Sequence, residues 1–495
     1  MPTLATERVL NGGSVMKPRE FVSALAISVF FCAAAFSQGL VYEEPYRVDY
    51  DSPSSSAPGV VVFNGVDHAA FYPFQGPDDA DKNLYFRRLD SAGVPSGPQK
   101  RVLTNTGLDW PMAAAWDGSA YVVAISSWIG NRNIYLVRVS AEGRMLARQD
   151  IDGYVYGGFI YDLPINPFLS VIDDEIFFCF TAGTDAASRR VILVHGPSKL
   201  GSQLTATTLP QGALTNANIL GMTCDTDGFL ALIGQVGLSD HEVKKALLLR
   251  IDFSGRPVGA PFPLEETITP GSASGPVFFG SGYLILYTLR EGSNYLNGSI
   301  VIDAEGNTLS GPNDLGWASE MLFWLNPIWN GRNVSSFAID VNWATNRFNS
   351  VHYTFNSKGK FLADPVTFYR RSNDPIFGSS QAFTGLATTI FYAAPTGHMG
   401  RYQLYSNQVS LPPSVTKSSV VYFAAGDSEV GRNGRMIVWS ATGCSSVLIK
   451  GKGVKLKRLP PVGCAVVKVK GKKLKLTLTV RGPGGKAKGK IVIRP

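Results

Sequence analysis

Residues that build most catalytic and metal sites are scarce in this sequence. Its 495 residues include five cysteines and five histidines. The histidines are dispersed along the chain without the close pairing of zinc ligands, at His68, His195, His241, His352 and His398. No nucleophile-and-base pattern and no phosphate-binding glycine loop occurs. The sequence therefore predicts no catalytic residue, no metal site and no cofactor.

Acidic residues are missing from one end of the chain. Residues 431–495 contain 17 Lys or Arg and no Asp or Glu, whereas the rest carries 29 basic and 38 acidic residues, a net charge of −9. Charged residues make up only 17% of the chain, so the difference in charge between the two parts is large for the number of charged residues present. An acidic body followed by a basic segment indicates a separate C-terminal domain whose charge has a use of its own.

Long hydrophobic runs are also missing, with one exception near the N-terminus. Met16 begins a short basic segment, and residues 21–36 are almost wholly apolar. The small residues Ala33 to Ala35 lie at the end of this apolar run. These are the three parts of a secretory signal peptide, and the run is shorter than the roughly 20 residues that span a bilayer. We assign residues 1–37 to the signal peptide, with 16–37 as its functional part. We therefore expect a secreted or cell-surface protein, with the periplasm as an alternative, and no membrane span after cleavage.

An internal repeat determines the expected fold. One half of the repeat is a strand, a tight turn and a second apolar strand, as in the segment that runs from Pro111 through Trp116, Asp117 and Gly118. Copies recur at intervals of 51 to 56 residues, with starts at Pro58, Pro111, Pro167, Gly221, Pro276, Pro327 and Ser380. Seven copies at a nearly constant period indicate seven similar structural units.

The other half of the repeat is an alternating strand that ends in a turn with glycine at its fourth position. Turns of this kind end at Gly93, Gly143, Gly255, Gly306 and Gly359. Asp, Asn or Ser at the first position bonds the turn backbone, and glycine adopts the left-handed conformation that closes the turn. No repeat has a helical period of ten or more residues, so each unit is expected to hold four short strands.

Four-stranded units at this period are typical of propeller blades. The segment from Pro111 to Gly118 resembles the repeats of bacterial secreted propeller arrays. The resemblance implies an all-β fold with a seven-bladed β-propeller over residues 42–410. Residues 42–50 precede the first repeat, and we expect them to supply a strand that closes the ring.

The chain changes character after a linker at residues 411–418. Residues 419–495 resemble bacterial immunoglobulin-like modules, which have a Trp-Ser strand, here at Trp439, and a late Thr-Leu-Thr-Val hairpin, here ending at Val480. The resemblance implies a small immunoglobulin-like β-sandwich, with Trp439 in its core. Alternation predicts Leu474, Leu476, Leu478 and Val480 on the inner face, and Lys475, Thr477, Thr479 and Arg481 on the outer face.

Four cysteines remain after signal cleavage, at positions 179, 224, 444 and 464. Cys444 and Cys464 both lie beside expected strands of the basic module. A small sandwich has a limited core to stabilise it, so we predict a disulfide between Cys444 and Cys464. Cys179 and Cys224 lie in adjacent repeats, and their pairing is left open.

The basic module contains a set of candidate polyanion-binding residues on alternate positions of apolar strands. These are Lys468, Lys470, Lys473, Lys475, Lys486, Lys488 and Lys490. Alternation puts most of them on one solvent face, where their fields add. Two alternative roles for these lysines stay open, because lysines also keep edge strands soluble and unpaired, and because a basic module can dock on an acidic body.

Three tryptophans near the repeat prolines are candidate ligand-stacking residues, namely Trp110, Trp324 and Trp329. Packing between blades is the alternative role for their rings. The favoured function is a non-catalytic exported binding or scaffold protein, with cell-surface or extracellular polysaccharide, or another exported protein, as its partner and no nucleic acid. The alternative is a secreted propeller glycoside hydrolase or polysaccharide lyase, which needs two or three carboxylates converging on the central channel.

Overall fold

The structure is a computed structural model in which residues 41–495 form one compact unit. It describes residues 41–42, 46–49, 59–75, 82–104, 108–127, 133–151, 167–183, 188–237, 242–264, 270–292, 294–318, 322–342, 347–372, 377–384, 387–395, 402–410, 417–430, 434–444, 446–470, 473–483 and 485–494. The predicted signal peptide and most of the predicted linker lie outside these residues. Within them, no helix has the length and hydropathy needed to cross a membrane.

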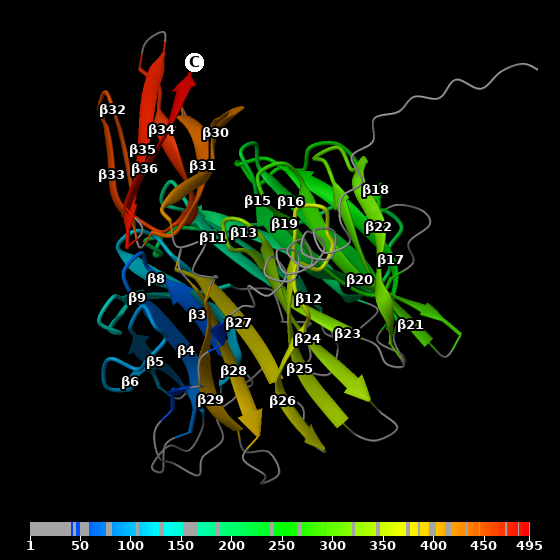
Figure 1. Cartoon of the computed structure of the whole chain (residues 1–495). Coiled ribbons are helices and arrows are strands. Elements are labelled where there is room, and N and C mark those ends of the chain that lie inside the picture. Colours follow the sequence, from blue (N-terminus) through cyan, green and yellow to red (C-terminus); the bar gives the residue numbers. More distant parts are fainter. Residues whose placement is uncertain are drawn as a thin grey trace, which may run out of the picture. The chain divides into compact units, whose positions relative to one another are not determined.

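The described part of residues 41–410 is an all-β body built from seven antiparallel sheets (Figure 1). Each sheet has a first strand, and these are β3 (Val60–Phe63), β7 (Leu108–Trp116), β11 (Phe168–Ile172), β15 (Ala217–Cys224), β19 (Pro270–Phe278), β23 (Leu322–Trp329) and β27 (Phe377–Phe383). The second strands are β4 (His68–Phe74), β8 (Ala120–Ser127), β12 (Glu175–Ala182), β16 (Phe229–Val236), β20 (Tyr283–Glu291), β24 (Val334–Asn342) and β28 (Ala387–Pro395). All seven repeat starts predicted from the sequence fall in or just before a first strand.

Two more strands complete each sheet. The third strands are β5 (Asn83–Leu89), β9 (Ile134–Ser140), β13 (Arg190–Pro197), β17 (Val243–Ile251), β21 (Asn294–Ile302), β25 (Arg347–Phe355) and β29 (Tyr402–Ser410). Six sheets have a fourth strand of their own, namely β6 (Lys100–Leu103), β10 (Met145–Asp150), β14 (Thr205–Thr208), β18 (Phe262–Pro263), β22 (Thr308–Ala318) and β26 (Val366–Ser372).

The first strands contact one another in a closed cycle, from β3 through β7, β11, β15, β19, β23 and β27 back to β3. Apolar side chains fill the space between neighbouring sheets, where clusters of buried residues from adjacent repeats form the core. Sheets that meet through their first strands and pack face to face around a centre make the body propeller-like.

The N-terminal segment closes the last sheet, as the sequence predicted. The short strands β1 (Val41–Tyr42) and β2 (Tyr46–Arg47) pair antiparallel with β29, where a fourth strand of the seventh sheet would lie. The backbone N–H of Val48 continues this pairing by donating to the carbonyl of Leu404 at 2.7 Å. Joining the two ends of the body in one sheet leaves no open edge at the seam.

The predicted glycine turns also form. At each predicted turn the first-position side chain accepts from backbone N–H groups, as Asp90 Oδ1 does from Ala92 and Val94 at 2.8 and 2.9 Å. The fourth-position glycines have positive φ angles, between 75 and 87°, at Gly93, Gly143, Gly255, Gly306 and Gly359. The turn chemistry read from the sequence is therefore confirmed at all five positions.

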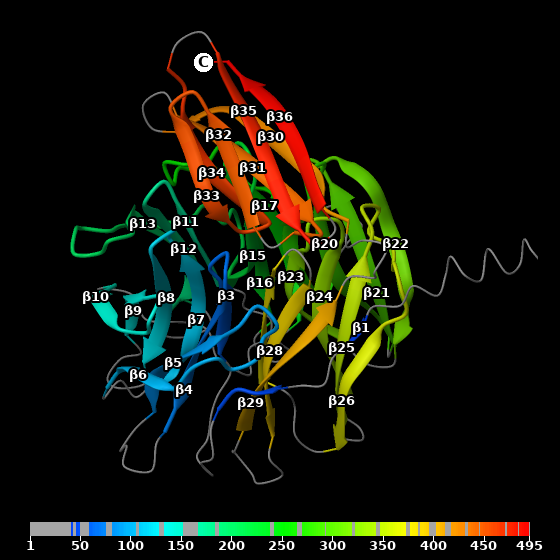
Figure 2. The ribbon, with the colours of Figure 1, turned by 60° about the vertical axis from the view of Figure 1, so that its left-hand side comes forward.

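The C-terminal module is a separate pair of sheets (Figure 2). One sheet contains β30 (Ser419–Val430), β31 (Gly434–Thr442) and β34 (Val462–Lys468). The other has the order β33 (Val454–Leu459), β32 (Ser446–Gly451), β35 (Leu474–Gly482) and β36 (Gly485–Ile493). The two sheets pack on a common apolar core, as in a β-sandwich.

The core of the module matches the pattern read from the sequence. Trp439 is 1% exposed, and its indole N–H donates to the carbonyl of Pro460 at 2.8 Å. The four predicted inward residues of β35 are all buried, whereas Lys475 and Arg481 are exposed. These predictions of Trp439 and of the β35 faces are confirmed.

Candidate functional site

The first sheet of the module packs on the body through apolar side chains. Met436 and Val438 of β31 belong to the same buried cluster as core residues of the sheets that begin with β11 and β15. Tyr422 of β30 packs edge-on against Phe278 and Trp329, with ring centroids 6.0 Å apart in each case. The other face of this sheet supplies Ile437 and Trp439 to the module's own core. The first sheet is thus covered on both faces.

Small residues allow the backbones of module and body to approach closely. A Cβ atom at Gly280 would lie 2.8 Å from the ring of Tyr422, and one at Gly426 would lie 2.0 Å from the carbonyl oxygen of Thr226. The hydroxyl of Ser440 donates to the carbonyl of Gly331 at 2.8 Å. These contacts make the docking of the module a specific packed interface.

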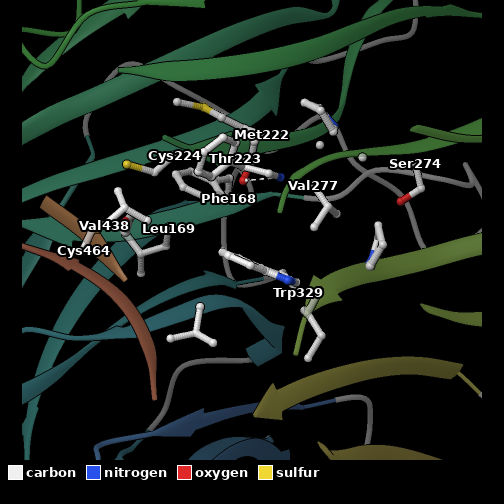
Figure 3. A pocket seen from close by; sticks show the side chains of 18 of the residues that line it. Phe168, Leu169, Met222, Thr223, Cys224, Ser274, Val277, Trp329, Val438 and Cys464 are labelled. Carbon is white, nitrogen blue, oxygen red and sulfur yellow. Dashed lines mark hydrogen bonds between the residues drawn. The ribbon is translucent and has the colours of Figure 1, made fainter. Parts of the chain in front are cut away.

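A cavity of about 370 Å³ lies between the body and the module (Figure 3). Its walls come from β11, β15, β19 and β23 of the body and from β31 and β34 of the module. The lining is mainly apolar and aromatic, and it includes Phe168, Met222, Phe278, Trp329, Val438 and Val462. Ser170, Thr223 and Ser274 are the hydroxyl groups of the lining, and Cys224 and Cys464 supply its two thiols.

Of the three predicted stacking tryptophans, the structure describes the side chain of Trp329 only, and this ring is not exposed. Trp329 is 8% exposed, because Phe278 and the module's Tyr422 pack against its ring. The side chains of Trp110 and Trp324 lie outside the described residues. For Trp329 the structure therefore supports the packing role.

The second sheet of the module carries a positively charged outer face. Its exposed cations, which we call the basic face, are Lys450, Lys455, Lys457, Lys475, Arg481, Lys486, Lys488 and Lys490. Their neighbours along each strand point the other way into the module core. The four strands contain no Asp or Glu, so no carboxylate of this sheet neutralises the face.

Strand register brings cations from distant parts of the sequence into rows. Lys455 of β33 is opposite Lys450 of β32, Lys450 is opposite Thr477 of β35, and Thr477 is opposite Lys490 of β36. A second like-charged pair joins Arg481 to Lys486. Like charges directly opposite each other destabilise a sheet by roughly 0.2–1 kcal/mol per pair, so this arrangement has a small folding cost.

The structure brings only part of the sequence-based set of lysines together on one face. Lys475, Lys486, Lys488 and Lys490 share the basic face, but Lys468 ends β34 in the other sheet, Lys470 follows it, and Lys473 lies just before β35. All three are exposed without belonging to the face. Sequence reasoning placed Arg481 on the outer face but left it out of the candidate set, and it missed Lys450, Lys455 and Lys457, because alternation places a residue on a face but does not say which strands are neighbours.

The predicted disulfide between Cys444 and Cys464 is not formed in the structure. Cys464 is opposite Val438 in the β31–β34 register, whereas Cys444 lies beyond the end of β31, which continues from Val438 to Thr442 over about 13 Å of extended strand. A bridge needs Cα atoms within about 4.4–6.8 Å. Cys444 is buried in the module core, whereas Cys464 packs against the cluster shared with the body. All four described cysteines are free.

In the described part of the chain, no group of three or more His, Cys, Asp or Glu residues is arranged to hold a metal ion. Among the predicted dispersed histidines, His68 and His352 are buried and His195 stacks on Phe177. His241 and His398 lie outside the described residues.

No protein-family model matches the chain, and no curated protein matches it. Among solved structures, an ulvan lyase of a polysaccharide lyase family has 10% identity and a TM-score of 0.45, over 75% of this chain and 96% of that chain. The neuraminidase-like protein of A/little yellow-shouldered bat/Guatemala/060/2010 has 13% identity and a TM-score of 0.38, over 75% and 99%. An acylaminoacyl peptidase of Pyrococcus horikoshii has 8% identity and a TM-score of 0.41, over 78% and 57%. At these values the likeness carries no information about activity.

Proposed function

We propose that this chain is an exported, non-catalytic binding or scaffold protein. In this proposal a seven-bladed β-propeller carries an immunoglobulin-like module, and the module binds polyanionic polysaccharide through its basic face. The proposal rests on one observation: eight exposed cations, with no carboxylate on their strands, occupy the outer face of the module's second sheet. The seven sheets in a closed cycle and the two-sheet module support the two fold assignments.

The location of the basic face favours an external partner over docking. The contacts between module and body run through the first sheet and are made by apolar and aromatic side chains, Val438 and Tyr422 among them. The basic face belongs to the second sheet, on the far side of the module core. Charge attraction to the acidic body is therefore not needed to hold the module in place.

The arrangement of the cations favours binding over solubility alone. Protection of sheet edges accounts for lysines on edge strands, but Lys450 and Lys475 lie on the two central strands, β32 and β35. Across a sheet, neighbouring strands are about 4.8 Å apart, and alternate residues along a strand are about 6.8 Å apart. A row from Lys455 to Lys490 thus presents closely spaced positive charges to an extended anion, whose counterions are released on binding.

Substitution of one row provides the test. We expect the purified protein to bind immobilised heparin, used as a sulfated polymer, and an immobilised polyuronate at about 50 mM salt, and to elute as ionic strength shortens the Debye length. The triple variant Lys450→Gln, Lys455→Gln, Lys490→Gln should elute at clearly lower salt, with affinity reduced at least tenfold. Surface plasmon resonance at several salt concentrations measures both effects.

A matched variant controls for net charge. Lys199, Lys358 and Lys360 are exposed lysines of the body, and changing all three to Gln removes the same charge from another surface. This control should bind the polymer as the original protein does. Equal loss in both triple variants, or no binding at about 50 mM salt, would overturn the proposal and leave solubility as the role of the lysines.

The alternative of a glycoside hydrolase or polysaccharide lyase has less support. Such an enzyme needs carboxylates at separations of roughly 5–10 Å. The seven first strands, which surround the centre of the body, contain Asp109 as their only acidic residue, and its side chain lies outside the described residues. Their other polar side chains are mostly Ser, Thr, Asn and Gln, which suit hydrogen bonding to a ligand.

Export is the remaining part of the proposal, and it rests on the apolar run over residues 21–36. N-terminal sequencing of the product recovered outside the cytoplasm should begin between about Ala35 and Gln38. A secreted product that still contains Met16 would contradict cleavage.

A further inference from the structure

Two half-buried cysteines meet where the module packs on the body. Cys224 ends β15 of the body, and Cys464 lies in β34 of the module. Both residues line the interface cavity, and both pack against the buried cluster that the module shares with the body (Figure 3). The Cys224 thiol also lies 3.3 Å from the carbonyl oxygen of Asp225. Two cysteines that line one cavity from opposite sides of the interface are candidates for a disulfide, which needs Cα atoms about 4.4–6.8 Å apart.

We propose that Cys224 and Cys464 form a disulfide that locks the C-terminal module covalently onto the propeller-like body. This pairing replaces the Cys444–Cys464 bridge expected from the sequence. It is independent of the polyanion proposal, because neither thiol belongs to the basic face.

The surroundings of the two thiols hold them together before any bond forms. Val438, which is opposite Cys464 in the sheet register, is buried in the cluster that also contains Met222 of β15. Tyr422 and Ser440 fix the same sheet to the body on either side, through Trp329 and Gly331. Since packing already places both cysteines at this interface, the bond adds a covalent link between surfaces that are in contact without it.

The two thiols also differ in reactivity. Interaction with the Cys224 thiol lowers the pKa of the Cys464 thiol, whereas interaction with Cys464 and burial raise the pKa of the Cys224 thiol well above its ordinary value. Cys179 and Cys444 are buried, and burial raises the pKa of both thiols. Because the thiolate is the nucleophile in disulfide exchange, Cys464 is the cysteine expected to react first.

The chemistry needs a disulfide oxidant, for which oxidised glutathione is a sufficient example. The Cys464 thiolate attacks one sulfur of the oxidant and releases one glutathione thiolate, which leaves a mixed disulfide. Cys224 then loses its proton to solvent and attacks the Cys464 sulfur, which releases the second glutathione thiolate. Two cysteine thiols are oxidised to one cystine, and one oxidised glutathione is reduced to two thiols.

Peptide mapping tests the pairing directly, because trypsin places the four cysteines in four different peptides. Cys224 falls in residues 200–244 and Cys464 in residues 459–468, whereas Cys444 falls in residues 436–450. The full protein is equilibrated with oxidised and reduced glutathione, blocked by alkylation and digested without reduction. We expect a linked pair of peptides 200–244 and 459–468 that disappears on reduction.

Single cysteine-to-serine variants show which two cysteines form the linked pair. Cys464→Ser and Cys224→Ser should each abolish the linked pair and leave the partner cysteine alkylatable, whereas Cys179→Ser should keep it. In the original protein the midpoint of thermal unfolding should fall on reduction, and in Cys464→Ser it should not change. A link between peptides 436–450 and 459–468, or four alkylatable thiols under oxidising conditions, would overturn the proposal.

Discussion

His68 and His352 are buried as neutral side chains in the body. His68 is fully buried, and its Nδ1 lies 2.9 Å from the carbonyl oxygen of Asp90, to which it donates. Its Nε2 is buried without a hydrogen-bond partner among the described residues. His352 hydrogen-bonds through Nε2 to Ser335. A proton added to either ring would place a cation where water cannot solvate it.

Burial lowers the pKa of His68 from 6.5 to about 4, although the Asp90 carbonyl and the charges of Asp90 and Asp67 act in the opposite direction. Burial lowers the pKa of His352 to about 3. Between these values and about pH 6.5 the unfolded chain binds protons that the folded chain does not. Stability is therefore complete above about pH 6.5 and falls as the pH decreases through this window.

We expect the substitution His68→Gln to remove part of this acid sensitivity. In the original protein, His68 should account for a loss of about 3 kcal/mol in the free energy of unfolding between pH 6.5 and 4, from 1.36 kcal/mol for each unit of pKa shift. Urea unfolding across this pH range measures the slope. In the double variant His68→Gln, His352→Gln the free energy of unfolding should depend on pH still less. A pH dependence in His68→Gln equal to that of the original protein would contradict the assignment.

At the scale of elements, the glycine turns pack against the neighbouring sheet and accept hydrogen bonds from it. Ser406 of β29 donates through its hydroxyl to the carbonyl of Gly93 at 2.6 Å, and Ser299 of β21 donates likewise to Gly359 at 2.6 Å. A Cβ atom at Gly143 would lie 2.2 Å from the Phe86 ring. Glycine is therefore needed twice at Gly143 and at Gly359, where a Cβ atom would lie 2.6 Å from Ser299 Oγ: for the backbone conformation and for the close approach of the adjacent sheet.

Gly143→Ala and Gly118→Ala distinguish these two needs. The φ angles are similar, 83° and 91°, but no atom lies within 4 Å of a Cβ at Gly118. We expect Gly118→Ala to lower the free energy of unfolding by about 1 kcal/mol through backbone strain alone. Gly143→Ala should cost roughly 1–3 kcal/mol more, because Phe86 is buried and has little room to move. Equal losses in a denaturant titration would show that the contact is relieved cheaply.

Side chains at the turn between the first and second strands also link neighbouring sheets. Asp225 is buried and ion-pairs with Arg250 of its own sheet, and Tyr283 of the next sheet hydrogen-bonds to Asp225. Asn64 donates to Tyr121 of the next sheet in the corresponding position, at 2.8 Å. The Asp-Gly turn of the repeat, read from the sequence as a hairpin, thus also contributes to packing between repeats.

At the scale of the whole molecule, the described residues from 41 onward form one unit because the module shares apolar clusters with the body. The interface is made of residues far apart in the sequence, such as Gly280, Trp329 and Tyr422. A module attached through a packed apolar sheet should unfold together with the body in a single transition.

We expect Tyr422→Ala to uncouple the module. Loss of a half-buried aromatic ring from a packed interface should cost roughly 1–3 kcal/mol, and calorimetry in reducing buffer should resolve a separate, earlier transition. Val421→Ala is the matched control, because Val421 is the preceding residue and is 44% exposed. Its effect should stay within about 0.5 kcal/mol. A single unchanged transition in Tyr422→Ala would contradict the assignment.

What the sequence by itself determined is local and periodic. Turn glycines such as Gly143, the spacing of the repeats, and the alternation of Leu474 to Arg481 follow from backbone sterics and strand geometry, which act over a few residues. What only the tertiary structure decided is which distant segments become neighbours. The row from Lys455 to Lys490 depends on the order of strands in a sheet, and the meeting of Cys224 and Cys464 at one interface depends on which sheet of the module packs on the body. The prediction that paired Cys444 with Cys464 relied on both lying beside strands of the module, and the structure separates them: apolar packing, which has no short-range signature, turns Cys444 into the module core and Cys464 toward the body.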